Sequence, residues 1–126
     1  MDLADYFANK QGTGVLATSD SAGNVDVAIY ARPYVIGEDT VAFSMTERLS
    51  YANVQSNPKA AYLFMERGEG YAGKRLYLTR TGEEKDPQRI EEAKKQHSRT
   101  YNPEDTHKHF VYFTVDKVRP LVGDDT

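Results

Sequence analysis

Apolar and polar residues alternate over most of this chain, and short segments rich in glycine, asparagine and aspartate interrupt the alternation. A period of two is typical of β-strands that bury one face, and the interruptions have the composition of turns. The pattern predicts six strands, near residues 13–19, 24–36, 40–45, 59–68, 75–84 and 109–123. We therefore expect a mainly β protein with an antiparallel sheet.

Helices are expected in three segments, near residues 2–9 from the spacing of Leu3, Tyr6 and Phe7, near 48–56 before an Asn-Pro stop, and near 86–99. The third has the clearest boundary signals, because Asp86 is a suitable N-cap and Pro87 stands at the first helical position. Its apolar stripe is limited to Ile90 and Ala93. We therefore expect this helix to lie on the surface.

The expected strand 24–36 separates two sets of side chains, because successive residues of a strand point to opposite faces. One face carries Val25, Val27, Ile29 and Ala31, and the other carries Tyr30, Arg32 and Tyr34. Pro33 has no N–H to donate, which predicts a bulge or an exposed edge at this point.

Residues 59–68 are apolar on both faces, as expected of a strand that is covered on both sides. Six strands in so short a chain favour a closed or partly closed barrel, since closure removes exposed strand edges. Apolar residues on the outside of such a barrel predict a cover, and a second copy of the chain would supply it.

Length and charge limit the classes of function. The 126 residues fit a single domain, 1–126. The chain carries 16 Lys and Arg against 19 Asp and Glu, a formal net charge of −3 without a basic block, so we expect no nucleic-acid partner. No apolar run approaches the roughly 20 residues that span a bilayer, so we expect a cytoplasmic protein with no membrane partner. The absence of cysteine excludes disulfides, thiol nucleophiles and thiolate zinc sites.

The start of the expected helix 48–56 is the first candidate site. Free backbone N–H groups and the helix dipole favour a phosphate there. Thr46 and Ser50 add hydroxyl donors, and Arg48 adds a charged fork that suits phosphate oxygens. In the alternative interpretation Thr46 is only a helix cap, while Arg48 and Ser50 are surface residues. The carboxylate of Glu47 would repel a phosphate.

Other candidate chemistry is weaker. His97, His107 and His109 lack a nearby acid at a recognised ligand spacing, so we interpret them as strand-edge and surface residues and expect no metal. No GxSxG motif marks a nucleophile, and catalytic residues are not identified. The segment GEGYAGKR lacks the spacing of a phosphate loop and is interpreted as a hairpin connection, from which Lys74 and Arg75 could reach an anionic ligand.

Three stretches together resemble the FMN-binding split barrels, the relatives of pyridoxamine 5′-phosphate oxidase, over nearly the whole chain. They are GVLATSDSAGNVDVAIYA, VAFSMTERLSYANVQSNPKAAYLF and GYAGKRLYLTRTGEE, and the last is similar to a subgroup of short members. The resemblance implies a six-stranded antiparallel split β-barrel of Greek-key type with short flanking helices. It also implies a homodimer that binds two FMN molecules at the subunit interface.

The resemblance also implies roles for individual residues. The isoalloxazine ring would lie against Ala28, Ile29, Tyr30, Ala31 and Arg32. Ser44 and Met45 would meet the ring or the ribityl chain, and the phosphate would lie at Thr46, Arg48, Leu49 and Ser50, with Asn53 one helical turn beyond. Tyr30 and Arg32 have alternative roles as barrel-wall and ion-pairing residues, and Asn53 as a brace of the helix.

Two departures from the family pattern change the expected function. Many relatives place a lysine where Ser50 stands, so the phosphate would rely on Arg48 or on a basic residue of GKR, Lys74 or Arg75. The longer pyridoxamine phosphate oxidases hold their substrate with a C-terminal arginine and histidine segment, whereas this sequence ends VRPLVGDDT. We therefore do not expect oxidation of pyridoxamine phosphate.

The resemblance therefore implies a small flavoprotein oxidoreductase that passes electrons or hydride between FMN and a small acceptor. Three alternatives stay open. They are a non-catalytic FMN module that exchanges electrons with a redox protein, a barrel that binds haem or a deazaflavin, and a barrel without a cofactor that serves as an interaction protein.

Overall fold

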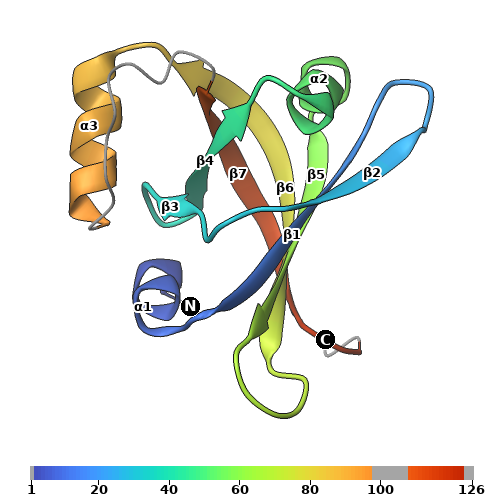
Figure 1. The fold of residues 1–126 in the computed structure, drawn as a ribbon, viewed down its shortest axis with the longest axis vertical. Helices are drawn as coiled ribbons and strands as arrows, with labels where there is room; N and C mark the ends of the chain where they lie inside the picture. Colours follow the sequence, from blue (N-terminus) through green and yellow to red (C-terminus); the bar gives the residue numbers. More distant parts are fainter. Residues whose placement is uncertain (1, 98–107, 124–126) are drawn as a thin grey trace.

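The computed structural model describes residues 2–97 and 108–123, which form one strongly curved antiparallel sheet with three short helices around it (Figure 1). The elements in chain order are α1 (Leu3–Asn9), β1 (Gly12–Ser19), β2 (Val25–Ile29), β3 (Tyr34–Val35), β4 (Thr40–Thr46), α2 (Leu49–Ser56), β5 (Lys59–Glu66), β6 (Gly73–Glu84), α3 (Pro87–Gln96) and β7 (Lys108–Pro120). None of the three helices has the length and apolar character needed to cross a lipid bilayer.

The described residues form seven strands, in the order β2-β1-β5-β6-β7-β4-β3, and this corrects the expected number of six. The expected strand 24–36 is in fact two strands, β2 and β3, which lie at opposite edges of the sheet. The chain leaves the ladder between them because Pro33 has no N–H and because Arg32 donates to the carbonyls of Phe7 and Lys10 at the end of α1.

The connection between β2 and β3 requires the sheet to curl. Five residue steps separate Ile29 from Tyr34, and they span at most about 18 Å when fully extended. The two edges of a seven-stranded sheet meet within that distance only if the sheet closes on itself like a barrel. In Figure 1 this connection crosses in front of the sheet, from the cyan-blue end of β2 to β3.

The inside of the barrel is filled by apolar side chains from six elements and closed at one end by α1. The fully buried members include Leu16, Val41, Phe43, Met45, Tyr62, Phe64, Leu76, Leu78, Val111 and Phe113. Tyr62 is the polar member of this set, and its hydroxyl donates to the carbonyl of Tyr30 at 3.1 Å. That hydrogen bond fixes the start of the connection that closes the barrel.

The chain itself covers only one face of β5, contrary to the expectation that this strand is covered on both sides. Tyr62 and Phe64 point into the core, whereas Leu63 and Met65 are exposed. The strand does lie inside the sheet, between β1 and β6. Its outer face exposes apolar side chains, and none of the three described helices packs on Leu63 or Met65.

Helix α3 covers a second, smaller apolar cluster on the outside of β4 and β7. Ile90 and Ala93 pack there against Tyr34, Ala42 and Phe110. The boundary signals are confirmed, since the Asp86 side chain accepts from the backbone N–H of Gln88. The helix lies on the surface, as its narrow apolar stripe predicted.

Candidate functional site

Two residues, Glu47 and Arg48, separate the end of β4 from the start of α2. The first turn of α2 has no side-chain cap. Arg48 is the N-cap residue, and its side chain makes no capping hydrogen bond. Thr46 therefore does not cap the helix, which removes the structural role that we had considered for it. The N–H groups of the first turn have no partner within the helix, so the positive end of α2 is available to an anion.

The uncapped helix start opens onto a pocket of about 540 Å³, a size typical of small-molecule sites. Its walls come from the end of β2 and the segment after it, the end of β4, the start of α2 and the first residue of β7. The lining residues are Asp26, Ala28, Ile29, Tyr30, Ala31, Ser44, Thr46, Arg48, Leu49, Ser50 and Lys108.

Nine of the fourteen residues expected at a flavin line this one pocket, namely Ala28, Ile29, Tyr30, Ala31, Ser44, Thr46, Arg48, Leu49 and Ser50. They come from segments about 15 residues apart in the sequence. The closure of the barrel brings them together, because the segment after β2 passes the end of β4.

Ser50 is turned toward Tyr30. Its side chain is buried. Burial raises the pKa of Tyr30, and the interaction with the Ser50 hydroxyl opposes that effect. The Tyr30 ring packs edge-on against Phe43 in the core, 5.9 Å between centroids. Tyr30 therefore belongs both to the barrel wall and to the pocket.

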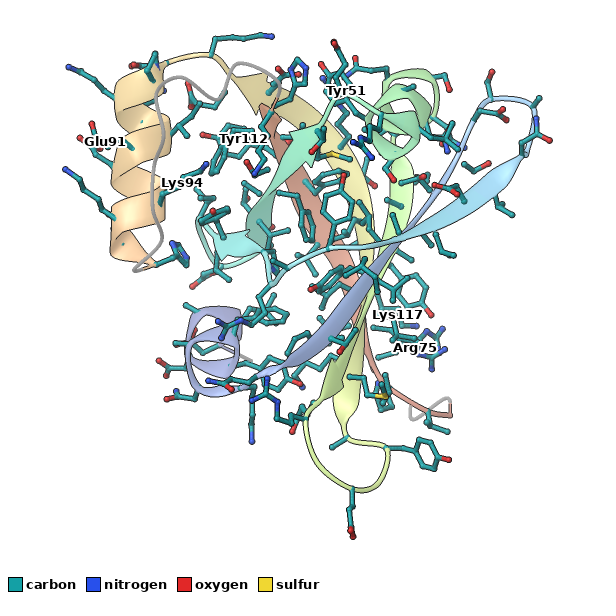
Figure 2. All side chains as sticks on the ribbon, viewed as in Figure 1. Tyr51, Arg75, Glu91, Lys94, Tyr112 and Lys117 are labelled. Carbon is teal, nitrogen blue, oxygen red and sulfur yellow. The ribbon has the colours of Figure 1, made fainter. Side chains whose placement is uncertain are left out.

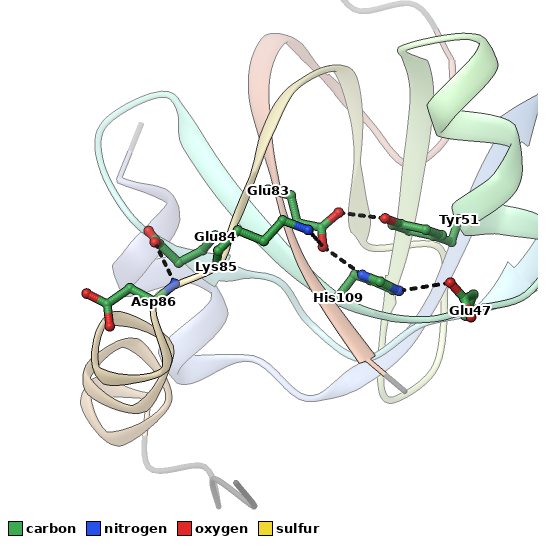
Figure 3. Close-up of polar contacts among 7 residues, drawn as sticks. All are labelled: Glu47, Tyr51, Glu83, Glu84, Lys85, Asp86 and His109. Atoms are coloured by element: carbon green, nitrogen blue, oxygen red, sulfur yellow. Dashed lines mark hydrogen bonds and ion pairs between the residues drawn. The ribbon is translucent and has the colours of Figure 1, made fainter. Parts of the chain in front are cut away.

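Glu47 is directed away from the pocket, toward His109. The Oε1 atom of Glu47 lies 3.5 Å from Nε2 of His109, and the other ring nitrogen of His109 lies 2.6 Å from Oε2 of Glu83 (Figure 3). The carboxylate that could repel a phosphate is thus paired with a histidine. We call Glu47, Tyr51, Glu83 and His109 the brace.

The brace ties four elements together. The ring of Tyr51 stacks on His109 with 3.9 Å between centroids, and its hydroxyl donates to Glu83 at 2.7 Å. Glu83 belongs to β6, His109 to β7 and Tyr51 to α2, while Glu47 lies in the turn between β4 and α2. Figure 3 shows the Glu83 carboxylate in contact with both Tyr51 and His109. The brace therefore fixes the start of α2 against the sheet.

The Glu83 carboxylate of the brace has a lowered pKa although its side chain is nearly buried. Burial alone would raise the pKa of Glu83, but hydrogen bonds from Tyr51, Lys85 and His109 outweigh it and lower the pKa to about 2. Burial and the bond to Glu83 raise the pKa of Tyr51 to about 12. Glu83 is therefore an anion and Tyr51 a neutral donor at any physiological pH.

Three of the expected site residues are used in the fold instead of lining the pocket. Arg32 donates to the end of α1, as described above. Met45 points into the core, because it alternates with Ser44 and Thr46 along β4. Asn53 is buried, and its Nδ2 donates to Oγ1 of Thr18 on β1 at 3.0 Å. This is the bracing role that we had considered for Asn53.

The two cations of the GKR segment also lie away from the pocket. The Lys74 ammonium lies 4.6 Å from the ring centroid of Tyr6. Arg75 donates to the carbonyls of Pro120 and Gly123, and it lines a hollow on the outer face of the sheet. Figure 2 shows Arg75 far along β6 from Tyr51, which marks the start of α2.

Sequence reasoning missed two residues of the pocket, Asp26 and Lys108. Asp26 precedes Ala28 and Tyr30 by two and four residues, so the alternation of β2 could have indicated it. Lys108 lies opposite Thr46 in the pairing of β4 with β7. That pairing joins residues about 60 apart, and no local signal in the sequence indicates it.

The described histidines are engaged within the fold. His97 accepts from the backbone N–H of Val35 through Nε2, and its Nδ1 lies 2.7 Å from the carbonyl oxygen of Ala93. His109 belongs to the brace, and His107 lies outside the described residues. Over residues 2–97 and 108–123, no group of three or more potential metal ligands converges.

Replacement of Asn53 by alanine is expected to lower the free energy of unfolding by about 1–2 kcal/mol, because a buried hydroxyl loses its partner. Urea unfolding of the variant measures this loss. Asn9→Ala is the matched control, since Asn9 donates to a carbonyl on the exposed face of α1. Equal stability of the two variants would contradict a bracing role for Asn53.

Solved structures of known proteins are similar to this chain in fold. Neither a model of a known family nor a curated protein matches the sequence. An FMN-binding protein from Syntrophomonas wolfei subsp. wolfei is similar with a TM-score of 0.75, covering 94% of this chain and 83% of that chain at 20% identity. A protein named F420 reductase gives a TM-score of 0.69, with 90% and 94% coverage and 16% identity.

A candidate pyridoxamine 5′-phosphate oxidase from Lactobacillus delbrueckii is also similar, with a TM-score of 0.65, 90% and 87% coverage and 22% identity. The described chain thus has the fold of these FMN-binding and pyridoxamine 5′-phosphate oxidase-like split-barrel proteins. The split-barrel fold that the sequence resemblance implied is confirmed, with seven described strands in place of the expected six.

Proposed function

We propose that this chain is a flavoprotein of the oxidoreductase class, which binds FMN in the pocket between β2, β4, α2 and β7 and acts as a homodimer. One observation carries the proposal. The uncapped start of α2 and the Arg48 side chain lie at the same pocket as the small apolar residues Ala28 and Ala31. A flavin mononucleotide has matching parts, an anionic phosphate and a flat ring.

The residues of the pocket fit this ligand in chemistry and in size. Arg48 and the N–H groups of the first turn of α2 would hold the phosphate. Thr46 and Ser44 are hydroxyl donors on the same strand face, suited to the ribityl chain. Alanine side chains at 28 and 31 leave room for a ring to approach the backbone. A volume of about 540 Å³ accommodates a ligand of this class.

Bound FMN would supply the hydride and electron transfer, so the protein needs no nucleophile of its own. The chain's residues then bind, orient and shield the cofactor. Tyr30 is protonated at neutral pH, as is usual for a phenol, and burial raises its pKa further, so the wall of the pocket is uncharged at that position. The proposed acceptor is a small molecule.

A second copy of the chain is proposed to cover the outer face of β2, β1 and β5. This face exposes Val25, Val27 and Ile29, of which Val27 is 67% exposed. An apolar hollow of about 270 Å³ lies on it, lined in part by Val15, Val27 and Leu63. Ile29 lines the flavin pocket as well, so a partner seated on this face would also reach the pocket.

Val27→Asp is expected to weaken self-association at least tenfold, because a buried interface does not tolerate an unpaired carboxylate. Sedimentation over a range of protein concentrations measures the association. Ile36→Asp is the matched control, since Ile36 is also exposed but lies in the turn after β3. A monomeric unmodified protein would contradict the proposed dimer.

The proposed function is tested by titrating the purified protein with FMN, with fluorescence quenching as the readout and gel filtration to separate bound flavin. We expect stoichiometric, co-eluting FMN. The deazaflavin F420 is titrated in parallel, because one similar structure is named F420 reductase. If the protein prefers F420, the cofactor is the deazaflavin and not FMN. A protein that binds neither would contradict the proposal.

Turnover separates an enzyme from an electron-transfer module. Oxidation of a nicotinamide by the FMN-loaded protein, with a small acceptor present, is the outcome expected of an oxidoreductase. Fast electron exchange with a redox protein and none with nicotinamide would favour the module instead.

A further inference from the structure

We propose that Lys108 is the second cation of the phosphate end of this pocket and acts together with Arg48. The inference rests on the proposed function, because it concerns the phosphate of the bound flavin. It assigns a binding role to a residue at the start of β7.

The charges of the pocket favour a second cation. A phosphate monoester carries between one and two negative charges at neutral pH, and Asp26 adds a carboxylate to the lining. Arg48 supplies one positive charge. Among the described residues that line the pocket, Arg48 and Lys108 are the cations.

The other basic residues that the sequence offered are directed elsewhere. Lys74 lies over the ring of Tyr6, and Arg75 donates to carbonyls near the end of β7. Ser50, on the first turn of α2, provides a neutral hydroxyl and no positive charge. Lys108 therefore lines the pocket, whereas Lys74 and Arg75 do not.

The strand register places Lys108 on the correct face. Lys108 lies directly opposite Thr46 in the antiparallel pair of β4 and β7. Side chains of opposite residues project from the same face of a sheet. Thr46 lines the pocket, whereas the next pair along the ladder, Met45 and His109, points to the other face.

The brace includes the residues adjacent in sequence to both cations. His109 follows Lys108 and is fixed between Glu83 and Glu47, 2.6 and 3.5 Å away. Glu47 in turn precedes Arg48. The two backbone segments that carry the cations are thus connected through His109 (Figure 3). This connection fixes the positions of the Cα atoms of Arg48 and Lys108 relative to one another.

The test compares two flavins that differ by the phosphate. FMN and riboflavin are titrated by fluorescence quenching into the unmodified protein and into the variants Lys108→Gln and Lys108→Arg. Lys95→Gln is the matched control, because Lys95 is 71% exposed on α3 and its loss changes the net charge equally. Thermal melting establishes that each variant is folded, which is expected because Lys108 is exposed.

We expect Lys108→Gln to weaken FMN about tenfold and to leave riboflavin unchanged, while Lys108→Arg keeps FMN affinity within about threefold. Lys95→Gln should match the unmodified protein. Unchanged FMN affinity in Lys108→Gln, or equal losses for both flavins, would overturn this inference and leave the proposed function standing. Failure of the unmodified protein to bind FMN would instead overturn the proposed function and the role of Lys108 with it.

Discussion

Arg48→Ala is expected to weaken FMN binding by about 1.5–3 kcal/mol, a factor of about 10 to 150, as is usual for the loss of a charge-assisted hydrogen bond. The physical reason is the location of Arg48 at the uncapped start of α2, where its guanidinium and the helix N–H groups share one pocket. Fluorescence quenching by FMN measures the change. The helix itself should persist, because the side chain of Arg48 makes no capping hydrogen bond.

The control for this experiment is Arg89→Ala. The Arg89 side chain is 72% exposed at the start of α3 and forms ion pairs with the neighbouring acids Glu84 and Asp86. Riboflavin, which lacks the phosphate, should bind the Arg48 variant and the unmodified protein alike. An Arg48 variant that binds FMN normally would show that this side chain does not contact the phosphate.

Glu83→Gln is expected to lower the free energy of unfolding at pH 7 by about 3 kcal/mol. The pKa of Glu83 lies at about 2, below its ordinary value of 4.5, so between these values the unfolded chain binds more protons than the native one. The carboxylate therefore contributes its full stability above pH 4.5, and this contribution is lost as the pH falls toward 2. About 2.5 units at 1.36 kcal/mol each give the stated magnitude.

Urea unfolding at pH 7 and at several values down to pH 2 measures this contribution. The acid loss of stability should be smaller in Glu83→Gln than in the unmodified protein, since the glutamine has no proton to gain. Glu92→Gln, an exposed position on α3, should keep the full acid loss. The groups that face Glu83 are Tyr51 on α2, His109 on β7 and Lys85 beyond the end of β6. Parallel acid profiles in the three proteins would contradict a paired carboxylate.

The local features of this protein were predictable because their signals are local. Asp86 and Pro87 marked the start of α3, and the period of two marked the strands. The break at residues 30–33 was only partly predictable. Pro33 indicated an interruption, but the departure of the chain to the opposite edge also depends on Arg32, whose acceptors lie on α1 about 22 to 25 residues earlier.

The phosphate end of the site shows the limit of sequence reasoning more clearly. Arg48 was found because a helix start has a recognisable pattern. Lys74 and Arg75 were chosen as supporting cations because they flank a glycine-rich turn, and the structure directs both elsewhere. Lys108 was overlooked because its proximity to Thr46 results from the pairing of β4 with β7, a long-range contact that depends on the whole barrel.

The location of β7 has a consequence for how the molecule is made. Within the described sheet β7 lies between β6 and β4, so a nascent chain that ends before it consists of two separate groups of strands. One group carries β2 and the other carries the end of β4, and residues of both line the pocket at the start of α2. The walls of this pocket can therefore be joined into one sheet only after β7 has been made and inserted between β6 and β4.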